Sequence, residues 1–137
     1  MDGSPRISKK IKGVDRDQFP KRGNLNKFRK FIDEENPKKE CFLTGKKISG
    51  TPSIDHVIPW SYMYSDDLWN LVYVLPNENS SKSNRLPNKK LIERLKIRNI
   101  KLFKTLKKKG INNKFTEELK LSIDNNYVEK FWIGFKG

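Results

Sequence analysis

The sequence predicts an α+β fold in which two short strands at the centre of the chain are flanked by helices. Residues 53–58 and 70–75 are runs of strand length with strong apolar character, and a proline follows each run. Before and after them, residues 24–36 and 88–109 carry apolar side chains at helical spacing among many charged ones. We therefore expect a strand pair packed against helices from both sides.

The segment before the first strand predicts a helix and a hairpin. Asn24 can cap a helix over residues 24–36, and a proline directly after Asn36 ends it. Residues 41–48 then predict a short hairpin with its turn near Gly45.

The central segment predicts strand, loop, strand and short helix. The loop over residues 60–68 is rich in aromatic residues, and it separates the strands over 53–58 and 70–75. Residues 77–84 are polar and begin with good capping residues, which favours a short helix that ends at Pro87.

The last third of the chain predicts two helices. The first, over residues 88–109, is amphipathic, with a break expected near Asn99 and a stop at Gly110. The second begins at Thr116, and its apolar positions include Leu119, Ile123, Tyr127 and Phe131.

Length and charge set the domain organisation and the class of partner. The 137 residues suit one domain, which we place at 24–137 behind a basic N-terminal arm over residues 1–23. The formal net charge of +14 favours a polyanionic partner, with nucleic acid first and an anionic membrane surface second. The membrane interpretation is weak, because the longest apolar run, residues 71–75, is far short of the roughly 18 residues of a span.

The single cysteine, Cys41, excludes an internal disulfide. The basic start of the chain is followed by no apolar stretch, so we expect no signal peptide. Both features point to a reducing, cytoplasmic setting. The abrupt N-terminal sequence also leaves open that the chain is part of a larger polypeptide.

The candidate catalytic residues lie where the predicted strands and helix of the central segment begin or end. His56 is the single histidine of the chain, and it follows Asp55 in the first strand. Three pieces occur in order: Ile54-Asp55-His56-Val57-Ile58-Pro59, then Trp69-Asn70-Leu71-Val72, then Asn79-Ser80-Ser81-Lys82-Ser83. Each piece is weak by itself, but the ordered set across a strand–strand–helix pattern resembles the HNH endonuclease family, in the subgroup whose last motif residue is asparagine.

The resemblance implies a ββα-metal core over about residues 41–87, followed by C-terminal helices over 88–133. It implies that Asp55 and Asn79 hold one Mg²⁺ or Mn²⁺ ion, while His56 acts as general base. These roles suit phosphodiester hydrolysis. A neutral imidazole, with an unperturbed pKa of about 6.5, can accept a proton from water. A hard cation with oxygen ligands can stabilise the leaving oxygen.

Three further residues receive roles from the same resemblance. Asn70 braces the loop between the strands through hydrogen bonds to the backbone, and so orients His56. Lys82, one helical turn after Asn79, can reach a phosphate or steady the site. Together with Arg85 it is a candidate nucleic-acid contact.

The sequence departs from many HNH relatives at the usual structural zinc site. Relatives often carry two Cys-x-x-Cys pairs, whereas here Cys41 stands alone in the first position and the second position has no cysteine. One thiolate cannot complete a four-ligand zinc site, so we predict no structural zinc. Cys41 is then expected to be a buried, small apolar residue.

Two local alternatives stay open. Asp66 and Asp67 can be metal ligands, although capping of a short turn around Ser65 is the favoured interpretation. The aromatic residues Trp60, Tyr62, Tyr64 and Trp69 can stack on bases or belong to the core, and we favour the core for Trp69.

The function predicted from these features is metal-dependent hydrolysis of DNA, most naturally double-stranded, in restriction or phage defence. One such site cuts one strand, so a double-strand break requires a homodimer or two nicking events. The alternatives are a basic nucleic-acid-binding module without catalysis, or the nuclease domain of a larger protein that other domains target.

Overall fold

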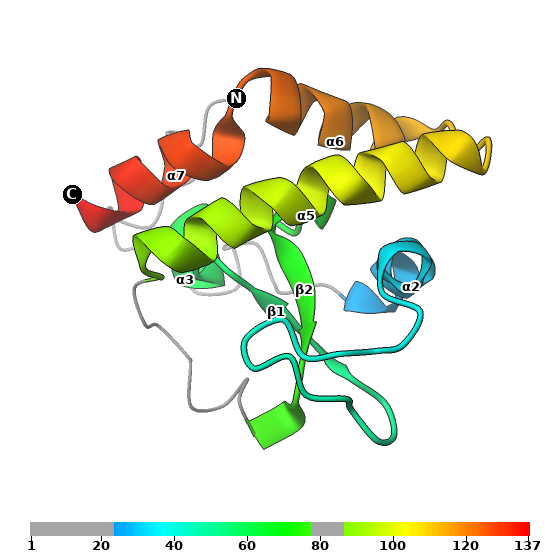
Figure 1. The fold of residues 1–137 in the computed structure, drawn as a ribbon. Coiled ribbons are helices and arrows are strands. Elements are labelled where there is room, and N and C mark those ends of the chain that lie inside the picture. Colours follow the sequence, from blue (N-terminus) through cyan, green and yellow to red (C-terminus); the bar gives the residue numbers. More distant parts are fainter. Residues whose placement is uncertain (1–23, 78–86) are drawn as a thin grey trace.

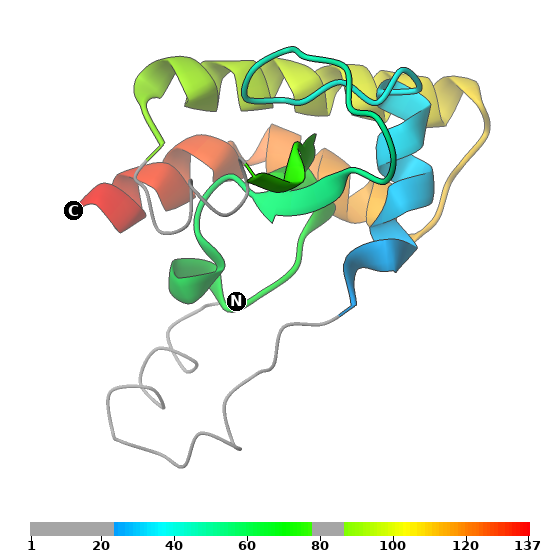
Figure 2. The same ribbon diagram turned by 90° about the horizontal axis from the view of Figure 1, so that it is seen from below.

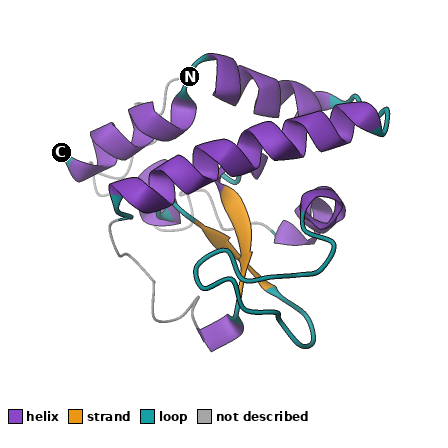
Figure 3. Ribbon diagram, viewed as in Figure 1, coloured by secondary structure: helices purple, strands orange, loops and turns teal. Residues whose placement is uncertain are grey.

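The structure, a computed structural model, describes residues 24–77 and 87–137. Their helices (η marks a 3₁₀-helix) and strands follow in chain order: η2 (Leu25–Phe28), α2 (Arg29–Glu35), β1 (Ser53–His56), α3 (Trp60–Met63), η3 (Leu68–Asn70), β2 (Leu71–Val74), α5 (Lys89–Lys108), α6 (Lys114–Asp124) and α7 (Tyr127–Lys136). The α+β architecture predicted from the sequence is therefore confirmed, with one strand pair among helices (Figure 3).

The two strands form an antiparallel sheet in which Ser53 pairs with Val74 and His56 pairs with Leu71. All four residues of β2 are buried, so the sheet is covered on both faces. The predicted hairpin lies beside β2 and is confirmed by a bridge between Glu40 and Lys47. Its turn includes Gly45, whose φ of 77° is readily adopted by glycine.

The long helix α5 organises the rest of the fold. Figure 1 shows α5 crossing in front of β1 and β2, with α6 and α7 returning along its other side. The perpendicular view in Figure 2 places α5 and the short helix α3 on opposite sides of the strands. In the segment between the strands, α3 therefore lies away from α5, whereas η3 contacts α5.

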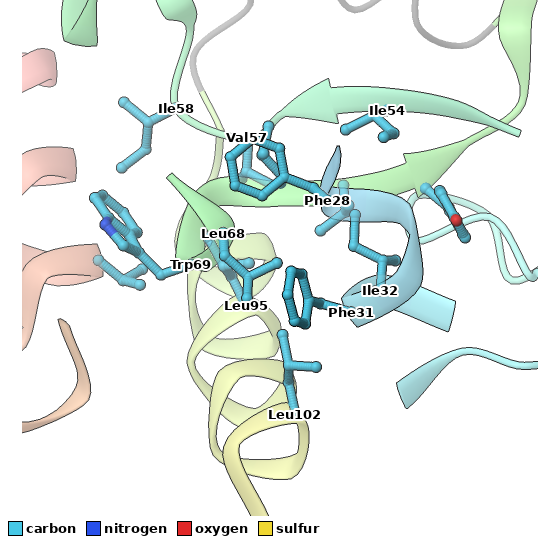
Figure 4. Packing of buried hydrophobic residues seen from close by; sticks show 14 of the residues in the cluster. Phe28, Phe31, Ile32, Ile54, Val57, Ile58, Leu68, Trp69, Leu95 and Leu102 are labelled. Atoms are coloured by element: carbon cyan, nitrogen blue, oxygen red, sulfur yellow. The ribbon is translucent and has the colours of Figure 1, made fainter. Parts of the chain in front are cut away.

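The hydrophobic core lies where α2, α5 and the strands meet. Figure 4 shows Phe28, Phe31 and Ile32 close to Leu95 and Leu102 of α5, below Ile54 of β1. Leu95 and Leu102 have no exposed surface, as expected for the apolar face of an amphipathic helix. Burial of a side chain of this size contributes roughly 1.5–3 kcal/mol, so the core fixes α5 firmly against the sheet.

A second apolar contact joins the sheet to α7. Trp69, just before β2, is buried, which confirms its predicted place in the core. Its ring lies 5.6 Å from that of Phe131 and 6.0 Å from that of Tyr127, centroid to centroid, and both partners belong to α7. The C-terminal helix is thus part of the same packed unit as the strands.

Three predictions about where helices begin, end or break were wrong. The loop over residues 60–68 contains α3, which ends at Tyr64 in the left-handed conformation. The break expected near Asn99 is absent, because the Asn99 side chain donates to the backbone oxygen of Trp69 instead of competing for the backbone of its own helix. The last helix is divided into α6 and α7 at Asn126, whose positive φ of 54° ends one helix direction and starts another.

Two sequence predictions lie outside the described residues. These are the basic arm over residues 1–23 and most of the short helix predicted over 77–84, of which Asn77 is described and is helical. Within the described part of the chain, no helix has the length and apolar character that crossing a membrane requires.

Close packing of α7 against α3 yields a prediction. A methyl group at Gly134 would lie 2.6 Å from the Tyr62 hydroxyl oxygen, so in Gly134→Ala either the Tyr62 side chain or one of the two helices must shift. We expect Gly134→Ala to lower the melting temperature in the native background. In a Tyr62→Phe background it should be neutral or stabilising, because alanine exceeds glycine in helix propensity by about 1 kcal/mol. Thermal unfolding of the four proteins checks this, and equal effects in both backgrounds would contradict the contact.

Candidate active site

His56 ends β1 and lies almost entirely inside the molecule. It is 6% exposed, and its Nε2 atom lies 2.8 Å from Oδ1 of Asp66. Asp66 comes from the segment between α3 and η3, ten residues further along the chain. Both side chains are shielded from bulk water, which strengthens the hydrogen bond between them.

The Asp66 contact was missed by the sequence analysis. The favoured interpretation, that residues 65–67 cap a turn, holds for Asp67, which accepts a hydrogen bond of 2.7 Å from the Ser65 hydroxyl. Asp66 instead faces His56. The available signal was an acidic pair in the loop of a strand–loop–strand unit that carries the single histidine, but which of the two carboxylates turns inward depends on the path of that loop.

Asp55 precedes His56 in β1 and lies in a different environment. Burial alternates along the strand: Ile54 and His56 are buried, whereas Ser53 and Asp55 are partly exposed. One carboxylate oxygen of Asp55, Oδ2, is nevertheless shielded from solvent. The strand thus directs a carboxylate and an imidazole from consecutive residues to opposite faces of the sheet.

Asn70 braces the backbone just beyond His56. It has no exposed surface, and its amide makes two hydrogen bonds with Ile58: the Ile58 N–H donates to Oδ1 at 2.8 Å, and Nδ2 donates to the Ile58 oxygen at 2.9 Å. The backbone oxygen of Asn70 also accepts from the N–H of Val57 at 2.9 Å. Three hydrogen bonds from one residue therefore fix the two residues that follow His56.

The returning chain is anchored where the described part resumes. The indole N–H of Trp132 in α7 donates to the backbone oxygen of Pro87 at 2.8 Å, and the side chain of Asn88 caps α5 by accepting from the Leu91 N–H. The predicted site residues Asn79, Lys82 and Arg85 lie outside the described residues.

The described residues contain no group of three or more metal-ligating histidine, cysteine, aspartate or glutamate side chains. Of the two predicted metal ligands, Asp55 is the one among the described residues. A carboxylate together with an amide oxygen is a donor set that suits a hard cation such as Mg²⁺. The second predicted ligand, Asn79, is in the segment over residues 78–86.

Cys41 is buried, as predicted, but it is more than a small apolar residue. Burial raises the pKa of its thiol, whereas hydrogen bonds from the Thr44 side chain and from the N–H groups of Leu75, Thr44 and Leu43 lower it. The net effect is a lowered pKa. The thiol sulfur thus ties the hairpin over residues 40–47 to the end of β2 by hydrogen bonding.

Comparison with known proteins agrees with this geometry. Residues 41–88 match a protein family described as HNH endonuclease. No curated protein matches the chain significantly. The matched range covers the hairpin turn, both strands and His56, ends at Asn88, which caps α5, and leaves α2, α5, α6 and α7 outside. Residues 41–88 are thus similar to the HNH endonucleases, a family of phosphodiester hydrolases that act on nucleic acid.

Proposed function

We propose that this protein is a metal-dependent endonuclease that hydrolyses phosphodiester bonds of DNA, with His56 as general base. The observation that carries the proposal is the buried pair of His56 and Asp66, held at 2.8 Å directly before a turn that Asn70 braces. The match of residues 41–88 to the HNH endonuclease family supports the same reaction class.

Asp66 gives His56 the orientation that a base needs. A carboxylate that accepts a hydrogen bond from the Nε2–H group keeps the neutral ring in the tautomer whose lone pair is on Nδ1. In the proposed reaction that nitrogen takes the proton from the attacking water. The Asn70 brace holds the backbone after His56 in place, so the imidazole does not swing away from the water.

Asp55 and Asn79 would hold the divalent cation, by the resemblance of their motif positions. The ion would neutralise charge on the scissile phosphate and on the leaving oxygen. We propose that Lys82 and Arg85 contact the phosphate backbone. The formal net charge of +14 supports a polyanionic substrate, because each cation that meets a phosphate releases counterions and strengthens binding.

The wider role belongs to the same proposal. We propose a zinc-free domain over residues 24–137 that acts on double-stranded DNA in restriction or phage defence, as a homodimer or within a larger polypeptide. The non-catalytic alternative, a basic binding module, explains the charge equally well but assigns no task to the His56–Asp66 pair. Metal-dependent cleavage separates the two.

The first prediction about activity concerns His56. His56→Ala should abolish nicking of supercoiled plasmid in Mg²⁺ or Mn²⁺ while leaving DNA affinity within about twofold, because the side chain is only 6% exposed and adds little to the surface that binds phosphates. Plasmid nicking and a binding titration measure the two effects. Undiminished nicking by His56→Ala would exclude His56 as the general base. If the native protein nicked no plasmid with either metal, the result would favour the non-catalytic binding module.

The second prediction concerns Asp66, for which the neighbouring aspartate is a matched control. Asp66→Asn should lower kcat about ten- to a hundredfold at saturating metal, as loss of an orienting hydrogen bond typically does. Asp67→Asn should have little effect, because Asp67 accepts its hydrogen bond from the Ser65 hydroxyl and not from His56. A raised Mn²⁺ requirement with unchanged kcat in Asp66→Asn would instead make Asp66 a metal ligand.

The third prediction concerns the metal. Asp55→Ala and Asn79→Ala should raise the Mg²⁺ or Mn²⁺ concentration needed for half-maximal nicking, because each removes one oxygen ligand. Asn77→Ala, two residues before Asn79 and exposed, is the control. Metal titrations that coincide with those of the native protein would exclude both residues as ligands.

A further inference from the structure

Two buried polar side chains of α5, Arg98 and Asn99, face the segment that carries Asn70. Arg98 donates from Nη1 to the Leu71 oxygen at 2.6 Å and from Nη2 to the Leu68 oxygen at 3.0 Å. Asn99 donates from Nδ2 to the Trp69 oxygen at 2.9 Å. Its Oδ1 accepts from Nε and Nη2 of Arg98 at 3.0 and 2.9 Å, so the two residues form one unit.

This unit is hydrogen-bonded to the backbone on both sides of Asn70. The carbonyl oxygens of Leu68, Trp69 and Leu71 all accept from it, and the remaining carbonyl, that of Asn70 itself, accepts from the N–H of Val57. Four consecutive carbonyl groups are therefore bonded to α5 or to the turn after His56. The direction of the Asn70 side chain is set by this backbone, since the residue lies at the junction of η3 and β2.

Stability alone is a poor explanation for this arrangement. Arg98 is 6% exposed, and its guanidinium donates to neutral oxygens of Asn99, Leu71 and Leu68. Burial lowers the pKa of its guanidinium to about 10, and Glu35 offsets part of this effect from a distance. A buried charge usually stabilises a fold less than a well-packed apolar residue of similar volume would. Its five donors in a rigid plane, however, fix two carbonyl groups at once.

We propose that Arg98 and Asn99 are positioning residues for the hydrolysis: they fix the backbone around Asn70, whose amide in turn fixes the end of β1 behind His56. This inference rests on the proposed function for its effect on catalysis. Both residues lie in α5 beyond residue 88, so the nuclease site depends on a helix outside the segment that matches the HNH family.

The kinetic test compares variants of Arg98 and Asn99 with destabilising control variants in the same helix. Arg98→Met and Asn99→Leu should lower kcat for plasmid nicking about ten- to a hundredfold, with KM nearly unchanged, because a small misplacement of a reacting group has effects of this size. Leu106→Ala and the milder Ile92→Val are controls, since both alter the buried face of α5 and neither touches the carbonyls of residues 68–71. These controls should retain kcat when assayed below their melting temperatures.

Arg98→Lys keeps the positive charge and provides a conservative variant. Its ammonium is a point donor and cannot span the Leu68 and Leu71 oxygens as the guanidinium does, so its kcat should lie between those of the native protein and Arg98→Met. If a single relation between kcat and melting temperature described both the controls and the Arg98 and Asn99 variants, the proposal would be overturned.

A second readout needs no cleavage and keeps this inference separate from the proposed function. Hydrogen exchange of the Ile58 amide reports the bond to Asn70 Oδ1, and the Phe42 amide, in the hairpin beside β2 and bonded to the Tyr73 oxygen, is the reference. Asn99→Leu and Arg98→Lys should speed exchange at Ile58 selectively, whereas Leu106→Ala should affect both amides alike. Equal acceleration in every variant would overturn the positioning role, even if the native protein cleaves no DNA.

Discussion

The paired hydrogen bonds between the Asn70 amide and the Ile58 backbone are the constraint on which the site depends. They close the turn that follows His56, beyond the end of β1 and next to the backbone hydrogen bond from Val57 to Asn70. The residue is completely buried, so water does not compete for these bonds. Loss of the amide would leave the Ile58 N–H and C=O without their partner in the interior, which is costly.

The flanking helices act on this constraint from different sides. α5 reaches the Asn70 backbone through Arg98 and Asn99. α7 contacts Trp69 with two aromatic rings and holds Pro87 through Trp132. A strand pair of four residues each is too short to be stable alone. The helices therefore supply both the buried area that stabilises the strands and the polar contacts that set the geometry at their ends.

Much of the fold could be predicted from the sequence because it depends on local patterns. The strand over Leu71–Val74, the amphipathic face of α5 and the turn at Gly45 all follow from spacing and residue type. The bracing bonds of Asn70 match what the motif resemblance implied. The division of the last helix at Asn126 was not predictable in this way, because a left-handed asparagine is decided by the docking of α7 on Trp69 rather than by its neighbours in sequence.

The sequence by itself determined the two strands and the long helix that begins after residue 88, the place of Asp55 and His56 at the end of the first strand, and the basic character that favours nucleic acid. Tertiary structure alone decided that Asp66, rather than Asp67, meets His56, and that Arg98 and Asn99 are buried under the Asn70 backbone. The reason is that these contacts join residues 10 to 30 positions apart. Spacing along the chain specifies which face of an element a side chain occupies, but its distant partner is chosen by how the elements pack.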